Sequence, residues 1–556
     1  MKKLPKIWKE KEIDKEKVKQ ISEKYGVNRF IAKILSNREF LLEKFGQDLT
    51  LKDLSDPFLF SQMEDICKRI EEAIDKKQKV LIYGDFDADG VTATTVLYKY
   101  LLFHGIKSLY YIPNRVEEGY GLGETGIKFI IENKPDLVIT VDNGITAHEQ
   151  IEEIKNNNID VIVTDHHELE GKEKPDCLTL NPKIEDKVFS GLSGVGVVFK
   201  LVSALNSRAK EKYDTWKLLP YVMIGTIADV CPMMYENRII AKLGFFAMKK
   251  SDEPAFIAMK DILLKNERID ETAIGYKIAP CINASGRLGS SDISLDLFLS
   301  DNLEESKKLV NRLIQINNYR QALVEEVYKQ AENQAKEYKD DSVLVLSDSS
   351  WHIGIIGIVA NKIAENFNKP TYIMVSDDDG LARGSARSYA DFDVFNSFEI
   401  AKELLITSGG HKLAGGFSLK SENINKFREL LNEIKTDSTN ASNIEIEFYL
   451  SNTDISYKNF KALNSLSPFG AKNEKPVFGI KQVRVLTSSA ISEGKHLKLR
   501  VDLEGTLLDC LYFYNGKLAE KITSGDFIDL AGRLNINRYN GKENLQMIIT
   551  DIRVAH

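Results

Sequence analysis

The sequence predicts an α/β protein with two α/β domains, a long connecting helix and a C-terminal β-barrel. Short β-rich runs alternate with helical stretches from about residue 75, and the last hundred-odd residues are dominated by alternating strands. Continuous apolar strands separated by helices are typical of a mainly parallel sheet that is covered on both faces. A chain of 556 residues is long enough for roughly two to four such domains.

The N-terminal half is expected to begin with helices and continue as the parallel sheet. Apolar residues recur at three- and four-residue spacing over residues 14–46, which predicts a helical segment within residues 1–50. Strands are expected in four runs, KVLIYGD, SLYYIPN, DLVITVD and DVIVTDHH. The intervening stretches VTATTVLYKYLLFHG, GIKFIIENK and AHEQIEEIKNN are expected to be helices. This first α/β domain is placed at residues 51–302.

A long helix is expected next, because no glycine or proline occurs between residues 290 and 353. A helical pattern without an internal stop is more typical of a bridge between domains than of a core element, and it is placed at residues 303–340. The run DSVLVLSD opens a second α/β domain, residues 341–436, and the polar stretch KTDSTNASN reads as a linker. Alternating strands, IEIEFYL among them, then predict a small β-barrel over residues 443–556, with an OB-fold as the leading candidate.

Composition narrows the class of protein. The hydrophobic fraction of 43% and charged fraction of 28% are ordinary for a globular protein, and no apolar run approaches the ~18 residues of a membrane span. The N-terminus has no apolar segment behind its basic residues, so no signal peptide is expected. Five scattered cysteines without a CxxC pair favour reduced thiols, a cytoplasmic location and no zinc finger. The net charge of −7 argues only weakly against a polyanionic partner, since bound cations would cancel acids in a metal site.

Acidic residues follow the apolar strands at several places along the chain. Three aspartates occupy five positions directly after the first strand, and further acids or histidines follow later apolar stretches: Asp85, Asp87, Asp89, Asp142, Asp165, His166, His167 and Asp229. Parallel strands share one carboxyl edge, where ligands bind in open α/β sheets. Carboxylates with imidazole and no thiolate suit Mn²⁺ or Mg²⁺, and two such ions can catalyse phosphoryl displacement.

Each of these residues also has a purely structural interpretation. An aspartate after a strand is commonly a turn former or a helix cap, as Asp142 and Asp165 would be if taken alone. Asp165 can equally orient His166 from behind instead of ligating a metal. A cap needs only one acid, however, so three aspartates in five residues favour a cation cluster.

The motifs resemble those of a known superfamily. GDFDADGVTATT, VDNGIT, VTDHHE and GTIADVCP are similar to the four motifs of the DHH phosphoesterases. IPNRVEEGYGL, INASGRLG, WHIGIIGIVANKIAE, ARGSARS and GGHKLAGGFS follow in the order seen in the bacterial single-strand-specific 5′ exonucleases of that superfamily. The C-terminal run RLNINRYNGKENLQMIITDI resembles their OB-fold. The resemblance implies a DHH domain, a smaller DHH-associated domain and an OB-fold.

The resemblance also implies roles for residues of this chain. Two Mn²⁺ or Mg²⁺ ions would be held by a set of acids and one histidine: Asp85, Asp87, Asp89, Asp142, His166 and Asp229. Asp142 would bridge the ions and Asp87 would share in catalysis. His167 would face the scissile phosphate as a charge stabiliser.

Binding of a 5′ end is implied for a second set of residues. A pocket for the terminal phosphate would be formed by Arg115, Arg287, Ser385 and Arg387, since arginine forks and a serine hydroxyl suit phosphate. Surface or interdomain ion pairs are the alternative for each arginine. His411 lies in a glycine-rich stretch whose amides can approach phosphate, and His352 precedes a predicted helix start or is a packed histidine.

The barrel offers weaker candidates for contacts to DNA. Basic and aromatic residues interleave around Lys498, Arg538 and Tyr539. OB-folds bind single strands through a positive groove with stacking platforms, but any half-exposed strand alternates in the same way.

The function implied is single-strand-specific 5′-to-3′ exonucleolytic hydrolysis that releases 5′-mononucleotides in DNA repair and recombination. The alternatives are a DHH phosphodiesterase acting on short oligonucleotides and a non-catalytic DNA-binding scaffold. Partners implied by the resemblance are single-stranded DNA, a RecQ-type helicase and a single-strand-binding protein. No membrane partner is expected, and the chain is expected to be a monomer.

Overall fold

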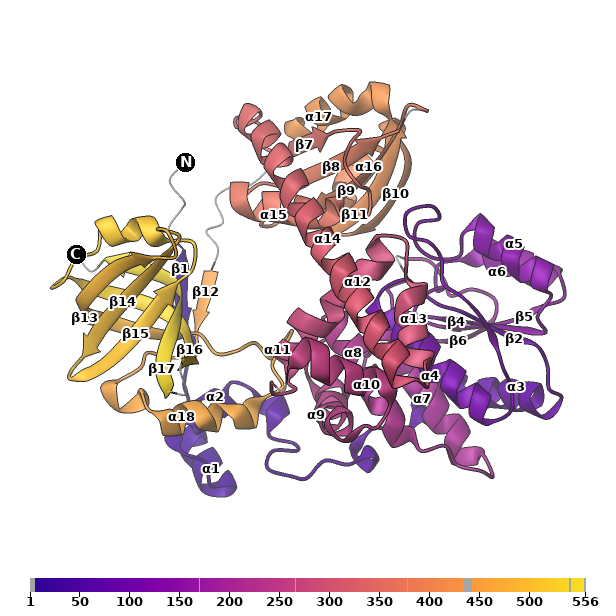
Figure 1. Cartoon of the computed structure of the whole chain (residues 1–556), viewed down its shortest axis with the longest axis horizontal. Helices are drawn as coiled ribbons and strands as arrows, with labels where there is room; N and C mark the ends of the chain where they lie inside the picture. Colours follow the sequence, from indigo (N-terminus) through magenta and orange to yellow (C-terminus); the bar gives the residue numbers. More distant parts are fainter. Residues whose placement is uncertain are drawn as a thin grey trace. The chain divides into compact units, whose positions relative to one another are not determined.

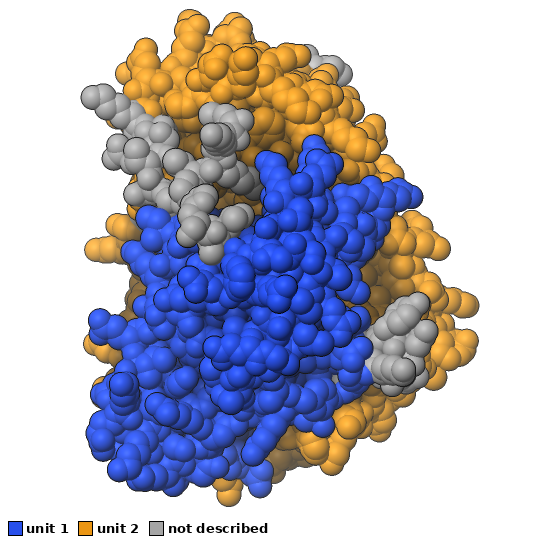
Figure 2. Space-filling model, turned by 90° about the vertical axis from the view of Figure 1, so that its left-hand side faces the viewer, with its two compact units in different colours: residues 1–51, 232–238, 441–556 blue, residues 52–231, 239–440 orange. Residues whose placement is uncertain are grey.

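The computed structural model describes residues 6–169, 171–265, 267–377, 379–434, 443–539 and 542–554. The chain divides into two compact units, coloured in Figure 2. The larger unit comprises residues 52–231 and 239–440, and the smaller comprises residues 1–51, 232–238 and 441–556. The predicted linker lies outside the described residues except for Asn443.

The first sheet of the larger unit is entirely parallel, as predicted (Figure 1). Its order is β3-β2-β4-β5-β6. The strands are β2 (Val80–Tyr83), β3 (Leu109–Tyr111), β4 (Leu137–Val141), β5 (Asp160–Thr164) and β6 (Leu178–Leu180). Every residue of β2 and β4 is buried, which explains their unbroken apolar sequences. The carboxyl ends of all five strands therefore meet at one edge.

Helices cover both faces of this sheet. On one face α5 and α6 contribute Ile127, Ile130, Ile151 and Ile154 to a core shared with β2, β4 and β5. The helices before the long connecting helix are α3 (Met63–Asp75), α4 (Ala88–Phe103), α5 (Glu124–Asn133), α6 (His148–Asn156), α7 (Gly194–Arg208), α8 (Leu219–Ala228), α9 (Tyr235–Lys250), α10 (Pro254–Met259), α11 (Glu271–Ala273), α12 (Ala279–Arg287) and α13 (Asp292–Leu299). Helix α4 is buried along most of its length because it packs against α7 and α8.

The long helix expected from the glycine- and proline-free stretch is α14 (Leu303–Glu337). The side chain of Asn302 caps it by accepting the Glu305 N–H at 3.0 Å. The helix packs against α10, α12 and α13, and also against β7 and α15. Val324, Val327 and other apolar residues of its second half join the core of the following sheet.

The second sheet is mixed and has the order β10-β11-β9-β8-β7. Only β7 and β8 are parallel, whereas the other neighbours are antiparallel. The strands are β7 (Leu344–Ser347), β8 (Thr371–Ser376), β9 (Leu381–Arg387), β10 (Leu405–His411) and β11 (Ala414–Lys420). The helices are α15 (Ile356–Phe367), α16 (Val394–Ile400) and α17 (Ile424–Glu433).

The smaller unit contains the predicted barrel, which is closed in the order β13-β14-β15-β17-β16. Its strands are β13 (Phe478–Ile491), β14 (His496–Leu503), β15 (Thr506–Tyr512), β16 (Phe527–Tyr539) and β17 (Lys542–Val554). Alternate residues of β14, such as Leu497, Leu499 and Val501, are buried in the barrel core. Five strands closed in this way form an OB-type barrel.

One predicted barrel strand lies partly elsewhere. Only the start of the run IEIEFYL belongs to β12 (Asn443–Ile446), which pairs in parallel with β1 (Ile7–Glu10) as a separate two-stranded sheet. This first part of the run lies outside the closed barrel, whereas Phe448 and Leu450 hydrogen-bond to Gly479 of β13 and join the barrel core. An alternating pattern specifies a half-buried strand but not its partner. The N-terminal helices α1 (Lys15–Tyr25) and α2 (Arg29–Ser36) and the helix α18 (Tyr457–Leu463) complete this unit. The ring of Phe30 packs against those of Phe448 and Phe478, 5.4 Å from each.

Candidate active site

The carboxyl edge of the first sheet gathers the acids and histidines that follow the strands. Asp85 and Asp87 follow β2, Asp142 follows β4, and His166 and His167 follow β5. Asp229 ends α8 and joins them. The Nε2 atom of His166 lies 3.2 Å from Asp142 Oδ1 and 3.8 Å from both Asp89 Oδ2 and Asp229 Oδ2. The structure thus brings together all the residues expected to hold the cations.

These acids are deeply buried and close to one another. Asp85, Asp89 and Asp142 are at most 3% exposed. Burial raises the pKa of each of these carboxyls well above its usual range, and the charges of neighbouring aspartates raise it further. Burial also raises the pKa of Asp229. When ionised, the cluster therefore concentrates negative charge that the surrounding hydrogen bonds and cationic side chains only partly offset.

Several atoms of the cluster that could coordinate a cation have no hydrogen-bond partner among the described residues. They are Asp85 Oδ1, Asp142 Oδ1 and His166 Nε2, all buried. Donor atoms of Asp85, Asp87 and Asp142 come within 4.8 Å of one another, as do those of Asp142, His166 and His167. Oxygen donors with imidazole are the ligands that Mn²⁺ and Mg²⁺ accept. The residues present fit divalent cations of this kind.

The local backbone explains how the aspartates are held. Asp142 has a φ of 64°, a left-handed conformation that aspartate tolerates better than most residues. A side-chain carbon at Gly194, the first residue of α7, would collide with the Asp142 carboxylate. The Asp89 carboxylate accepts the N–H groups of Gly194 and Val195 at 2.6 and 2.9 Å. Asp87 caps α4 by accepting the N–H groups of Asp89 and Gly90, so the cap and the cluster are compatible for this residue.

Asp165 orients His167, whereas His166 was the histidine considered for this role from the sequence. Its Oδ1 atom lies 2.7 Å from His167 Nδ1, and its Oδ2 accepts the Ile145 N–H at 2.9 Å. Although burial opposes charge on both groups, the interaction lowers the pKa of Asp165 and raises that of His167 to about 9. The Tyr120 hydroxyl also lies 3.0 Å from His167 Nδ1. Tyr120 was not among the predicted site residues, although it lies in the motif EEGYGL.

Three predicted phosphate-binding arginines form a positive cluster beside the acids. Burial, the charge of Arg115 and, more weakly, that of Arg387 lower the pKa of Arg287 to about 10. The charges of Asp85 and Asp87 act on Arg115, whose guanidinium lies 4.9 Å from the Phe86 ring centre. Buried arginines whose charges act on one another are typical of an anion-binding site.

The beginning of α15 lies against the same cluster. Arg387 donates to the Ser385 hydroxyl at 2.9 Å. A side-chain carbon at Gly357, in the first turn of α15, would lie 2.9 Å from the Arg387 guanidinium and 3.0 Å from the Ser385 hydroxyl. Since helix N-termini favour anions, backbone and arginine side chains converge on one place.

The remaining candidates are placed less decisively. His352 is half-buried. It lies near Arg287, as shown by Gly354 two residues further on, where a side-chain carbon would collide with the Arg287 carbonyl. His411 is exposed at the β10–β11 turn, where its Nδ1 accepts the Leu413 N–H at 3.2 Å. Lys498 is exposed on β14. The side chains of Arg538 and Tyr539 lie outside the described residues.

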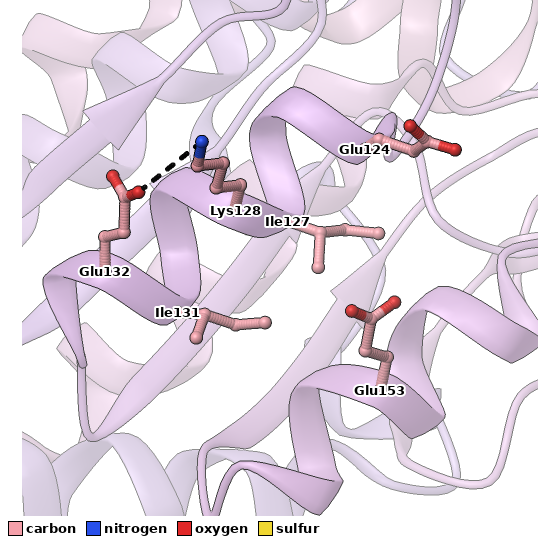
Figure 3. Close-up of a pocket in the computed structure, with 6 residues that line it drawn as sticks. All are labelled: Glu124, Ile127, Lys128, Ile131, Glu132 and Glu153. Carbon is pink, nitrogen blue, oxygen red and sulfur yellow. Dashed lines mark ion pairs between the residues drawn. The ribbon is translucent and has the colours of Figure 1, made fainter.

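A hollow of about 580 Å³ lies elsewhere, between α5 and α6 (Figure 3). It is lined by Glu124, Ile127, Lys128, Ile131, Glu132 and Glu153. Lys128 pairs with Glu132 at 3.9 Å across one turn of α5. None of the predicted site residues lines it, so the carboxylate cluster, and not this hollow, is the candidate site.

Sequence families agree with this architecture. Residues 79–226 match the DHH family N-terminal domain, residues 340–437 the DHHA1 domain, and residues 446–551 the RecJ OB domain. Together with the carboxylate cluster, these matches define a metal-dependent phosphoesterase of the DHH class.

Whole-chain relatives narrow the class. A Bacillus subtilis protein named single-stranded-DNA-specific exonuclease RecJ is 33% identical over 99% of this chain and 71% of its own length. The crystal structure of RecJ from Thermus thermophilus with Mn²⁺ matches with a TM-score of 0.86 at 26% identity, covering 99% of this chain and 80% of that one. A structure of RecJ from the same organism with Mg²⁺ gives a TM-score of 0.79 at 24% identity, covering 99% and 79%. The chain belongs to the RecJ family of single-stranded-DNA-specific exonucleases.

Proposed function

We propose that this chain hydrolyses single-stranded DNA from the 5′ end and releases 5′-mononucleotides. One observation carries the proposal: a carboxylate cluster with unpartnered donor atoms adjoins an arginine cluster, and Asp85 and Asp87 act on the charge of Arg115. Cations held by the carboxylate cluster and the adjoining arginine cluster would provide two neighbouring anion-binding sites. A scissile phosphate at the first and a terminal 5′ phosphate at the second would be one nucleotide apart along a strand.

The metal-holding residues would be Asp85, Asp87, Asp89, Asp142, His166 and Asp229, with Asp142 between the two ions. When bound there, two divalent cations would supply a more acidic water and positive charge for the oxygens of an in-line phosphoryl displacement. The positions of these carboxylates are fixed by the Asp87 cap of α4 and by the close contact between Gly194 and Asp142. Asp89 contributes while its carboxylate stays bonded to the start of α7.

His167 would act on the scissile phosphate as a hydrogen-bond donor. Asp165 and Tyr120 both engage its Nδ1 atom, which fixes the ring plane. The His167 side chain is 42% exposed, so its ring remains reachable by substrate. A fixed donor aimed at developing charge stabilises the transition state more than a mobile one.

The arginine cluster would bind the 5′ phosphate and stop the strand there. Arg115, Arg287 and Arg387 supply forked donors, Ser385 a hydroxyl, and the start of α15 backbone N–H groups. His352 beside Arg287 and His411 on the β10–β11 turn would add contacts to the strand. A chain without a free 5′ end could not place its phosphate in a closed pocket of this kind.

The rest of the molecule would serve the same reaction. We place the DHH domain at residues 51–302, the connecting helix at 303–340, the DHH-associated domain at 341–436 and the OB-fold at 443–556. The OB-fold would hold the continuing strand, with Lys498, Arg538 and Tyr539 as candidate contacts. A RecQ-type helicase and a single-strand-binding protein would supply substrate to a monomeric, cytoplasmic enzyme. No helix among the described residues is long and apolar enough to cross a bilayer.

The test uses the full chain, Mn²⁺ and a single-stranded oligonucleotide labelled separately at each end. We expect the 5′ label to appear at once as mononucleotide while the 3′-labelled strand shortens gradually. Consumption of short oligonucleotides alone would favour the DHH phosphodiesterase alternative. Binding without hydrolysis would favour the non-catalytic scaffold.

A second measurement tests the terminal pocket. Arg387→Ala should lose most of the preference for a 5′-phosphorylated end over a 5′-hydroxyl end, about 10- to 100-fold if it removes one charged hydrogen bond. Arg383→Ala is the matched control, because Arg383 lies on the same strand β9 but is exposed. Equal preferences in the two variants would contradict the pocket assignment.

A further inference from the structure

A thiol lies beside the carboxylate cluster and has no role in the proposed reaction. Cys231 is 6% exposed, and its Sγ donates to Asp229 Oδ2 at 3.0 Å. Donor atoms of His166, Asp229 and Cys231 all lie within 4.8 Å of one another. This is a ligand set of one imidazole, one carboxylate and one thiol.

A second observation points to a cation at the same place. Asp142 is 2% exposed, and its Oδ1 lies 3.2 Å from His166 Nε2, yet both atoms lack a hydrogen-bond partner among the described residues. The unpartnered His166 nitrogen belongs to the set that contains Cys231. Atoms that could coordinate a cation are therefore present here without a hydrogen-bond partner among the described residues.

The chemistry of this set differs from that of the Mn²⁺ or Mg²⁺ centre. Hard cations prefer oxygen ligands, whereas a thiolate selects softer ions such as Zn²⁺ and Cd²⁺. Zn²⁺ accepts sulfur, nitrogen and carboxylate oxygen together in a tetrahedral site. Affinity for nitrogen and sulfur donors also favours Zn²⁺ over Mn²⁺ in general.

We propose that Cys231, His166 and Asp229 form a binding site for a thiophilic divalent cation, with Zn²⁺ as the inhibitory occupant. The inference rests on the proposed function in one respect, because His166 and Asp229 are also assigned to the catalytic cations. Zn²⁺ held through Cys231 takes two ligands away from the catalytic arrangement. The nuclease would then be inhibited by Zn²⁺ in the presence of Mn²⁺.

Binding exchanges a proton for the cation. The Cys231 S–H bond breaks, a sulfur–metal bond forms, and the proton leaves to the buffer, with no change of oxidation state. The hydrogen bond from Sγ to Asp229 is lost, and both atoms become ligands. No further reactant is needed.

The other cysteines provide internal controls. Cys281 is also buried, but its Sγ donates to the Lys277 carbonyl at 3.2 Å. Among the described residues, Cys231 is the one cysteine that belongs to a group of possible metal ligands. A signal that depends on Cys231 and not on Cys281 would identify the site.

The first experiment titrates Cd²⁺ into the chelator-treated full chain and follows the ultraviolet sulfur-to-cadmium charge-transfer absorbance. One equivalent of this signal is expected in the wild type and in Cys281→Val, and none in Cys231→Val or Cys231→Ser. Circular dichroism of each variant confirms folding. A signal that persists in both Cys231 variants, or is missing from the wild type, would overturn the proposal.

The second experiment measures inhibition by Zn²⁺ relative to each variant's own Mn²⁺-supported nuclease activity. The Zn²⁺ concentration for half-inhibition should rise at least ~10-fold in Cys231→Val, equivalent to about 1.4 kcal/mol. An unchanged value would show that Zn²⁺ acts elsewhere. If no variant, nor the wild type, degrades DNA, the proposed function fails while the cadmium signal still decides the thiol site. Nuclease activity without the cadmium signal would support the proposed function and overturn the thiol site.

Discussion

Two regions of this chain bury charged groups, and they do so in opposite ways. In the smaller unit Arg38 is 5% exposed and donates to Glu447 at 2.9 Å, to Asn473 at 2.7 Å and to the Glu474 carbonyl at 2.7 Å. Lys11 adds a second cation 3.4 Å from Glu447. In the larger unit, Asp85, Asp89 and Asp142 are buried at least as deeply, and burial, followed by the charges of neighbouring aspartates, raises their pKa values.

The difference separates a structural cluster from a binding site. Asn473 is fully buried, and its amide also donates to the carbonyls of Leu466 and Pro468, so the network around Arg38 links distant parts of the smaller unit. Buried charge that is paired and hydrogen-bonded persists without a ligand. Buried charge that is mainly of one sign costs stability until a cation binds. Compensation, more than burial itself, distinguishes the two regions.

The largest expected effect follows from removing one charge of the uncompensated cluster. Asp142→Asn keeps a residue that tolerates the left-handed backbone but removes the carboxylate that we propose the two cations share. We expect nuclease activity to fall to background and the metal-free protein to become more thermostable. The wild type should gain ~2.7 kcal/mol when Mn²⁺ reaches a hundred times its dissociation constant, and the variant should gain almost nothing.

Calorimetry with Mn²⁺ and with chelator measures both effects. The exposed Asp186 supplies the control, since Asp186→Asn removes the same charge from the surface. Retained activity, or a Mn²⁺-dependent rise in Tm equal to that of the wild type, would contradict the assignment of Asp142.

The paired cluster should respond in the opposite direction. Arg38→Ala leaves Glu447 buried without its main partner, which costs about 3–5 kcal/mol of stability. Hydrogen exchange of the barrel strands and denaturant unfolding would measure the loss. Arg29→Ala, an exposed change at the start of α2, is the control. Arg38→Met combined with Glu447→Gln should recover much of the loss, and a double variant as unstable as Arg38→Ala would refute the pairing argument.

A smaller effect is expected at the Asp165–His167 pair, a compensated pair that adjoins the uncompensated acids of the larger unit. Asp165→Asn removes the charge that supports His167 and should lower kcat about 10- to 100-fold, as expected for a hydrogen bond to a charged group. Because Asp165 is a positioning residue, Mn²⁺ binding measured by calorimetry should change little. Nitrogen NMR of the His167 ring would report the altered protonation. A collapse of Mn²⁺ affinity comparable to that of Asp142→Asn would instead identify Asp165 as a ligand.

The smallest effect concerns the second group on the same imidazole. Tyr120→Phe removes one hydrogen bond to His167, worth about 0.5–1.5 kcal/mol, and should lower kcat roughly two- to tenfold with KM nearly unchanged. Tyr319→Phe, at an exposed tyrosine of α14, is the matched control. Single-turnover kinetics with end-labelled DNA would resolve a change of this size. Equal rates for both variants would remove Tyr120 from the site.

The parallel sheet, the long helix, the barrel and most of the acids of the cluster could be predicted from the sequence alone. These features are local: apolar runs set strands, the missing glycines and prolines set α14, and Asp85, Asp87 and Asp142 follow their strands directly. A shared strand edge then brings such residues together without further information.

Which groups act on one another depends on the folded arrangement of the chain. The pairing of β12 with β1, the contact of Asp165 with His167, and the approach of Cys231 to Asp229 depend on packing between segments or on side-chain direction. Periodicity states which face of an element is buried but not what lies against it. For that reason, only the folded chain shows which of the charges remain uncompensated.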